Sequence, residues 1–141
     1  PFHLSRLVVA GMAQRGYGRC VYTSSTAART AEHAGSAYNS SKSGLLGLMR
    51  SVAQDGGPHN VTANAVLPGW VRTEMAERSA RAEAQRRGIT PEEVWAERGK
   101  LYPPGRVVTP REVAEVIAFF ASEESGGVSG EAIAVALGGI W

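Results

Sequence analysis

Runs of apolar residues divide the chain into short and long segments that alternate. Apolar positions over 2–15 recur at the spacing of one helix face, and longer patterns of the same kind cover 36–55 and 110–122. Short apolar runs bounded by Gly, Pro or Asn predict three strands, over 19–24, 60–66 and 131–136. Such alternation implies parallel strands joined by right-handed crossovers. We therefore predict an α/β fold with a parallel sheet that helices cover on both faces.

A stretch rich in Ala, Arg and Glu separates the second strand from the last helix. It contains a Thr-Pro-Glu-Glu start signal, which predicts two short helices, over 74–87 and 91–99. We expect residues 74–104 to form a helical lid over a substrate. Trp95 and Tyr102 are its large aromatic side chains, and each could face the substrate or pack onto the body of the protein.

Composition narrows the class of protein and its partners. Apolar residues make up 43% of the chain, and 141 residues are enough for one domain, 1–141. No apolar run reaches about 18 residues, so we predict no membrane partner. The net charge is +2, and the arginines over 78–87 alternate with glutamates, which indicates a solvated helix face and no nucleic-acid partner. No spacing of His, Cys, Asp and Glu predicts a metal site, and the single Cys20 is consistent with a reducing, cytoplasmic location.

Three residues carry the candidate chemistry. Tyr38 and Lys42 lie four residues apart in a predicted helix, so their side chains share one face. A nearby ammonium group favours the phenolate form of a tyrosine, which would let it exchange a proton with an alcohol or ketone. Ser25 lies thirteen residues before the tyrosine, where a predicted strand ends, and its hydroxyl could bind the same oxygen. The neighbouring Ser24 is the alternative hydroxyl, and the spacing favours Ser25.

Further motifs follow this triplet. They are the segment from Asn64 through Pro68 and Gly69 to Thr73, the segment from Gly105 through Pro110 and Glu112 to Ala114, and Ser129-Gly130 before the last strand. With Ser25 and the Tyr-x-x-x-Lys pair, their order and spacing resemble the short-chain dehydrogenase/reductase family, in its short single-domain form. The resemblance implies the second half of a Rossmann-like, doubly wound parallel sheet.

The resemblance also implies a role for each residue. Tyr38 would be the general acid in reduction and the base in oxidation, Ser25 would orient and polarise the carbonyl, and Lys42 would favour the phenolate and bind the nicotinamide ribose. Pro68, Gly69, Val71 and Thr73 would form the loop that holds the carboxamide of NAD or NADP. His33, Trp95, Tyr102 and Ser25 would border the substrate, although a surface position for His33 and a helix-capping role for Thr73 are open alternatives.

The resemblance further implies an oxidoreductase that interconverts a small-molecule alcohol and ketone, such as a 3-oxoacyl carrier-protein reductase. A homodimer or homotetramer is expected, because relatives pair the helix over 36–55 with its copy. That helix carries more apolar residues than one sheet face requires: Leu45, Leu46, Leu48, Met49 and Val52. Trp141 could join a second interface.

The family's Gly-rich turn and its relay asparagine do not occur in the chain. We therefore interpret the chain as the C-terminal half of a protein of about 250 residues, and we expect it to be inactive alone. Two other functions stay open. One is a non-catalytic binding or oligomerisation module, and the other is an extended-type sugar epimerase or dehydratase, which shares the Tyr-x-x-x-Lys pair.

Overall fold

A central parallel sheet positions every element of the protein. We describe the fold from a computed structural model, in which residues 1–31 and 34–139 are described. The elements follow the order α1 (Phe2–Arg15), β1 (Gly18–Thr23), η1 (Thr26–Ala28), α2 (Ser36–Gly56), η2 (Gly57–His59), β2 (Val61–Pro68), α3 (Glu74–Arg87), α4 (Pro91–Gly99), α5 (Pro110–Ala121) and β3 (Ala132–Val135). The predicted helices and strands are confirmed, with ends that differ by one or two residues.

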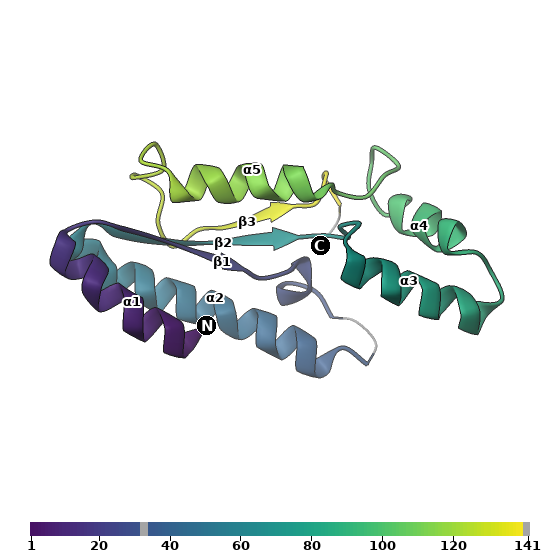
Figure 1. The fold of residues 1–141 in the computed structure, drawn as a ribbon, viewed down its shortest axis with the longest axis horizontal. Helices are drawn as coiled ribbons and strands as arrows, with labels where there is room; N and C mark the ends of the chain where they lie inside the picture. Colours follow the sequence, from purple (N-terminus) through teal and green to yellow (C-terminus); the bar gives the residue numbers. More distant parts are fainter. Residues whose placement is uncertain (32–33, 140–141) are drawn as a thin grey trace.

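The three strands lie in the order β1-β2-β3 and all pair in parallel, as the alternation of elements predicts. The central strand β2 is buried from Val61 to Leu67. Helices α1 and α2 cover one face of the sheet and α5 covers the other (Figure 1). This arrangement explains why β2 is buried continuously, its polar residues Thr62 and Asn64 included.

The helix α2 places its apolar residues in the core. Met49 is fully buried, and Leu46 and Val52 are nearly so, while Leu45 and Leu48 pack against the same cluster. Leu45 and Leu48 stay partly exposed, so pairing of α2 with its copy in another subunit stays a prediction. The helix α1 also exposes large apolar side chains, at Phe2, Leu4 and Leu7. Trp141, which we expected at a second interface, lies outside the described residues.

The helices α3 and α4 pack against each other beyond the carboxyl end of β2 (Figure 1). Their shared core is built from the small alanines of α3 and from Val94 and Trp95 of α4. Thr73 caps α3, since its Oγ1 accepts a hydrogen bond from the amide of Ala76. Thr90 caps α4 through a capping box with Glu93. The helices of the predicted lid thus form; their role as a lid stays a prediction.

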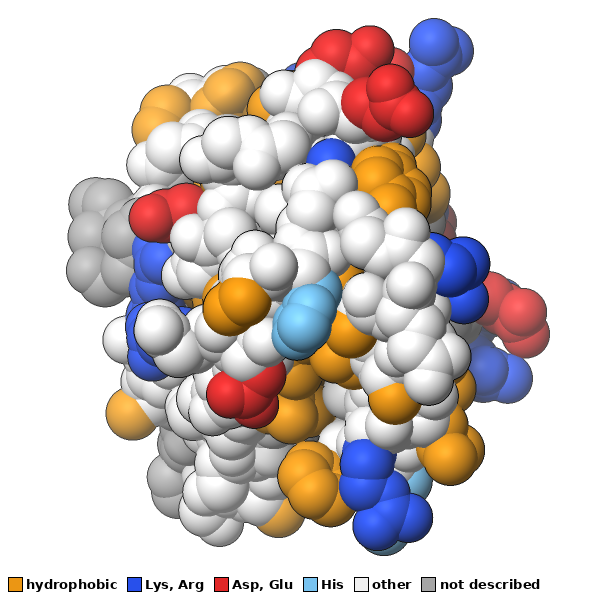
Figure 2. Space-filling model, turned by 90° about the vertical axis from the view of Figure 1, so that its left-hand side faces the viewer, with side chains coloured by type: hydrophobic (Ala, Val, Ile, Leu, Met, Phe, Trp, Pro, Cys, Tyr) orange, Lys and Arg blue, Asp and Glu red, His pale blue; other side chains and the backbone are white. Residues whose placement is uncertain are grey.

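The surface is mixed in charge. Figure 2 views the end of the molecule where the strands begin, and there acidic and basic side chains alternate around the rim with separate apolar ones between them. None of the described helices is both long and apolar enough to cross a membrane. Within 1–31 and 34–139, no three His, Cys, Asp or Glu side chains gather in a way that could hold a metal ion.

Candidate active site

The carboxyl ends of β1 and β2 bring the predicted serines and the Pro68-Gly69 turn to one edge of the sheet. The amide of Ser24 donates to the carbonyl of Val66 (2.9 Å), which fixes this edge. The buried hydroxyl of Ser24 donates to the carbonyl of Lys42 (2.8 Å), so this serine fastens α2 to the strand end. Ser25 begins η1, where its Oγ accepts from the amide of Ala27 (3.2 Å), and it stays partly exposed. The geometry therefore favours Ser25 over Ser24 as the hydroxyl available to a ligand.

Tyr38 and Lys42 occupy the first two turns of α2. The Nζ atom of Lys42 lies 5.6 Å from the centroid of the Tyr38 ring and donates to the carbonyl of Thr23 (3.1 Å). That bond holds the ammonium group at the end of β1, beside the tyrosine. The Tyr38 side chain is 50% exposed, so its hydroxyl is accessible. Sequence reasoning missed Asn39, whose Nδ2 donates to the carbonyl of Thr30 (2.9 Å) and ties the loop after Ser25 to the start of α2.

These residues surround a hollow of about 620 Å³ at the carboxyl edge of the sheet. Four of the predicted site residues line it, namely Ser25, Tyr38, Gly69 and Tyr102. The structure adds six side chains that sequence reasoning missed, namely Thr26, Thr30, Trp70, Met75, Ser79 and Leu101. The position of Trp70 directly after Pro68-Gly69 was the one available signal for it. The hollow therefore has a hydroxyl-bearing side at Ser25 and Tyr38. We call Trp70, Met75 and Leu101 its apolar side, and Ser79 of α3 adds a hydroxyl group to the lining.

The predicted cofactor loop is held tightly. The amide of Gly69 donates to the carbonyl of Val135 (3.1 Å), and the amide of Trp70 donates to the hydroxyl of Tyr102 (2.6 Å). Val71 pairs with Val108 in an isolated parallel bridge. The helix-capping role of Thr73 is confirmed, and binding of a carboxamide by Val71 and Thr73 stays a prediction.

One of the predicted substrate residues, Trp95, does not line this hollow. Trp95 is only 5% exposed, and its indole packs in the core shared by α3 and α4. Its Nε1 donates to Glu77 (3.1 Å), so the expectation that Trp95 faces the substrate is corrected in favour of packing. The helical spacing of apolar residues could not distinguish these two positions of Trp95, because an apolar side chain is expected either against a substrate or against a neighbouring helix. His33 lies outside the described residues.

Asn64 has a structural role. Its side chain is fully buried, with Nδ2 donating to the carbonyl of Val128 (2.8 Å) and Oδ1 accepting from the amide of Glu131 (3.1 Å). It thus binds the backbone that leads into β3. Both hydrogen bonds lie before β3 and not at the Pro68-Gly69 turn.

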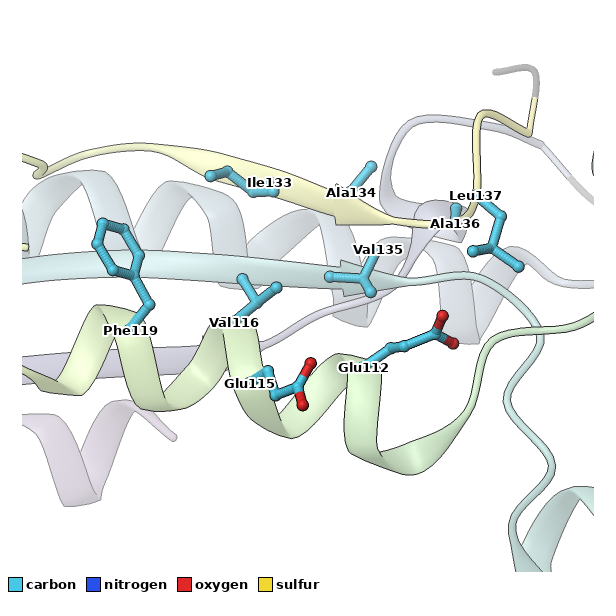
Figure 3. Close-up of a pocket in the computed structure, with 9 residues that line it drawn as sticks. All are labelled: Glu112, Glu115, Val116, Phe119, Ile133, Ala134, Val135, Ala136 and Leu137. Atoms are coloured by element: carbon cyan, nitrogen blue, oxygen red, sulfur yellow. The ribbon is translucent and has the colours of Figure 1, made fainter.

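A second hollow, of about 530 Å³, lies between α5 and β3 and contains none of the predicted residues (Figure 3). Phe119, Val116 and Ile133 supply its apolar surface, and Glu112 lies at its end. The Glu112 carboxylate binds the guanidinium of Arg106 (2.7 Å) and the amide of Thr109 (2.8 Å). The hydrogen bond from Arg106 and then that from Thr109 lower the pKa of Glu112 to about 2, so this carboxylate is occupied in capping α5.

Two groups with raised pKa values lie near β1 but away from the candidate site. Burial raises the pKa of the Cys20 thiol, which is packed between the sheet and α1. Burial also raises the pKa of Tyr22, although its hydroxyl shares a hydrogen bond with Ser5 (2.8 Å), which acts in the opposite direction. Tyr22 belongs to the core cluster under α1 and α2, and Cys20 packs against that cluster.

Comparisons with known proteins agree with this fold. A family profile described as enoyl-(acyl carrier protein) reductase matches residues 1–139. The chain belongs to the short-chain dehydrogenase/reductase family. It is 36% identical over 130 residues to the D-beta-hydroxybutyrate dehydrogenase of Cupriavidus necator, covering 92% of this chain and 50% of that protein. The chain therefore spans about half the length of the curated relatives it matches.

Solved structures give the same result. A structure of an NAD+-bound xylitol dehydrogenase superposes with a TM-score of 0.87 and 29% identity, covering 97% of this chain and 55% of that one. The F189W actinorhodin polyketide ketoreductase with NADPH superposes with a TM-score of 0.83 and 32% identity, covering 91% and 49%. The predicted Rossmann-like fold is confirmed, and the chain corresponds to one part of that fold.

Proposed function

We propose that the full-length protein containing this chain interconverts an alcohol and a ketone with NAD or NADP. One observation carries the proposal: Ser25 and Tyr38 line the same hollow, and the ammonium group of Lys42 lies over the Tyr38 ring. A hydroxyl pair beside a positive charge is suited to hold a carbonyl oxygen and to pass it a proton. The relatives named above include both dehydrogenases and a ketoreductase, in keeping with a reversible reaction of this class.

The residues present fit the nicotinamide end of such a cofactor. Gly69 lines the hollow, and the amino group of Lys42, held at the end of β1, would bind a ribose hydroxyl. Val71 and Thr73 would hold the carboxamide through the loop that begins at Gly69. When bound, the cofactor supplies or accepts hydride. The chain contains no Gly-rich turn for a pyrophosphate, and the contacts described here distinguish no group at the ribose 2′ position, where NAD and NADP differ.

Each of the three residues then has one task. Ser25 donates a hydrogen bond to the substrate oxygen and orients it. Tyr38 gives that oxygen a proton in reduction and takes it back in oxidation. Lys42 stabilises the phenolate that forms when the tyrosine has lost its proton. The substrate would be a small alcohol or ketone, including 3-oxoacyl compounds, and we propose a homodimer or homotetramer in the cytoplasm.

The test is a pair of single-atom changes. Tyr38→Phe should lower kcat at least a hundredfold in the full-length protein, because general acid–base catalysis contributes about 10²–10⁴-fold. Tyr17→Phe is the matched control, since Tyr17 is exposed and stacks on Arg19, outside the hollow. Lys42→Ala should lower kcat and also weaken cofactor binding. Substantial turnover by Tyr38→Phe would refute the proposal and would favour a binding module.

A further inference from the structure

The apolar side of the hollow depends on Trp70, whose backbone is fixed on both sides. Its amide donates to the hydroxyl of Tyr102 (2.6 Å), and its carbonyl accepts from the amide of Val108 (3.0 Å). These bonds set where the residue sits but leave the indole ring to be positioned by its neighbours. The ring is a wall of the hollow, in the same loop as the predicted cofactor residues.

Arg98 provides that positioning. Its guanidinium carbon lies 3.8 Å from the centroid of the Trp70 ring and 4.8 Å from that of Trp95. The arginine side chain is 7% exposed, and its Nη2 donates to Glu83 of α3 (2.9 Å). A cation held against aromatic faces away from water interacts more strongly than one at the surface. The contact therefore restrains the indole of Trp70.

The arrangement is more than a stabilising contact requires. Nη1 of Arg98 is buried and has no hydrogen-bond partner among the described residues. Burying a charged group with an unsatisfied donor costs free energy that an apolar side chain of similar volume would avoid. An apolar residue would fill the same space between α3 and α4, but it would attract the two indoles less specifically. The positive charge of Arg98 serves both the ion pair with Glu83 and the contacts with the two indoles.

The other partners of Trp70 around the hollow indicate what the wall would bind. Met75 on α3 and Leu101 after α4 line the same hollow and are 72% and 62% exposed. Large apolar side chains left exposed beside an indole form a surface that gains free energy when an apolar ligand covers it. The hydroxyl groups of Ser25 and Tyr38 lie on the other side of the same hollow.

We propose that Trp70, with Met75 and Leu101, selects ketones and alcohols that carry an apolar substituent, and that Arg98 acts as the positioning residue for the Trp70 ring. This inference rests on the proposed function for the reacting end of the substrate. Beyond that function, the inference adds the class of substituent that the substrate carries and the residue that positions the Trp70 ring.

Binding is tested without relying on turnover. The full-length protein is labelled with 5-fluorotryptophan, and the Trp70 signal is assigned by its loss in Trp70→Phe. We expect 2-octanone to shift the Trp70 signal at saturation and to leave the Trp95 signal in place, whereas acetone should shift neither. A Trp70 signal that 2-octanone does not move would overturn the proposal.

The role of Arg98 is tested against Arg87, which also binds Glu83 (2.9 Å) but lies over no indole among the described contacts. Arg98→Met should broaden or shift the Trp70 signal without ligand and weaken 2-octanone binding about tenfold, the scale of one pocket contact. In turnover, KM for 2-octanone should rise by a similar factor, with a smaller change for acetone and for kcat. Arg87→Met should match the wild type, and equal effects of the two variants would refute a positioning role.

Two further controls separate the possible failures. Tyr38→Phe should abolish turnover yet leave the shift of the Trp70 signal by 2-octanone unchanged, so loss of the proposed function alone does not affect this result. If thermal melting shows that Arg98→Met does not fold, Trp70→Leu replaces it. That variant leaves the Arg98–Glu83 pair in place and should weaken 2-octanone binding in ligand-observed saturation-transfer spectra. Unchanged 2-octanone binding by Trp70→Leu would overturn the proposal.

Discussion

Gly69 is the position where the loop of the candidate site has no room for a side chain. A Cβ atom there would overlap the hydroxyl oxygen of Tyr102 and would lie 3.0 Å from its Cζ and 3.2 Å from the Cβ of Ala136. Tyr102 cannot swing aside freely, because it is 8% exposed and its hydroxyl accepts from the amide of Trp70. Gly69→Ala should therefore shift backbone, and overpacking of this kind costs about 2 kcal/mol.

The hydroxyl of Tyr102 is responsible for most of this overlap, so a double-mutant cycle isolates it. Tyr102→Phe alone should cost about 1 kcal/mol, because the Trp70 amide loses its acceptor. In the double variant the hydroxyl is absent, and the total cost should fall short of the sum by about 1 kcal/mol. Cζ at 3.0 Å remains close, so the relief is incomplete.

Urea denaturation of the four proteins in the full-length form measures these free energies of unfolding. Gly69→Ala should also lower the melting temperature by about 4–8 °C. Gly47→Ala is the control, since a Cβ there meets nothing within 4 Å in an exposed turn of α2, and it should stabilise by about 0.5–1 kcal/mol. Additive costs, or a Gly69→Ala protein as stable as the wild type, would refute the steric account.

Three further predictions concern other parts of the chain. The pKa of Glu112 is lowered to about 2, so this carboxylate contributes its full stabilisation above the ordinary carboxyl pKa near 4.5 and loses it as the pH falls towards 2. Thermal melting at pH 7, 5 and 3 should show that Glu112→Gln is less stable than the wild type at pH 7 and that the difference is smaller at pH 3. Glu115→Gln is the control. Asn64→Leu should lower the free energy of unfolding by about 3 kcal/mol, because it removes the partners of the Val128 carbonyl and the Glu131 amide; a loss below about 1 kcal/mol in urea denaturation would contradict this. The 141 residues expressed alone should aggregate, because β1 pairs on one edge only within the described sheet and α1 exposes Phe2, Leu4 and Leu7. They should also bind neither NADH nor NADPH in calorimetric titrations. Micromolar binding by a chain that melts cooperatively would contradict this prediction.

The sequence predicted the framework of the site because local patterns determine it. The apolar runs placed β1 and β2, and parallel pairing then required their ends to meet, which brought Ser25 and Gly69 to one edge. The helical spacing of Tyr38 and Lys42 needed no tertiary information. The largest difference is at the end of β2: Leu67 and Pro68 extend the strand because they pair with Ala134 and Val135 of β3. A proline had indicated a stop, but it can still close a strand.

The apolar side of the hollow could not be predicted in this way. Arg98 and Trp70 are far apart in sequence. From the sequence, Arg98 is expected to be a charged residue on a helix surface, and Trp70 is expected to be an aromatic residue in a loop. Their contact exists only because α4 folds back over α3 and both lie against the Gly69 loop. The position of Trp95 could not be predicted either. The sequence left open whether its indole faces a substrate or packs against α3, and in the structure the indole packs there and donates a hydrogen bond to Glu77.

The two sides of the hollow therefore rest on different kinds of interaction, and this separates what their variants should do. Ser25 and Lys42 are held by hydrogen bonds to backbone at the ends of β1 and η1, so their positions are fixed by the sheet itself. Trp70 is held by the stacking of a side chain from α4, a helix whose own core is shared with α3 and not with the sheet. Changes in α3 and α4 should consequently alter KM and the preference among ketones while leaving kcat nearly intact, and changes at the strand ends should lower kcat for every substrate alike.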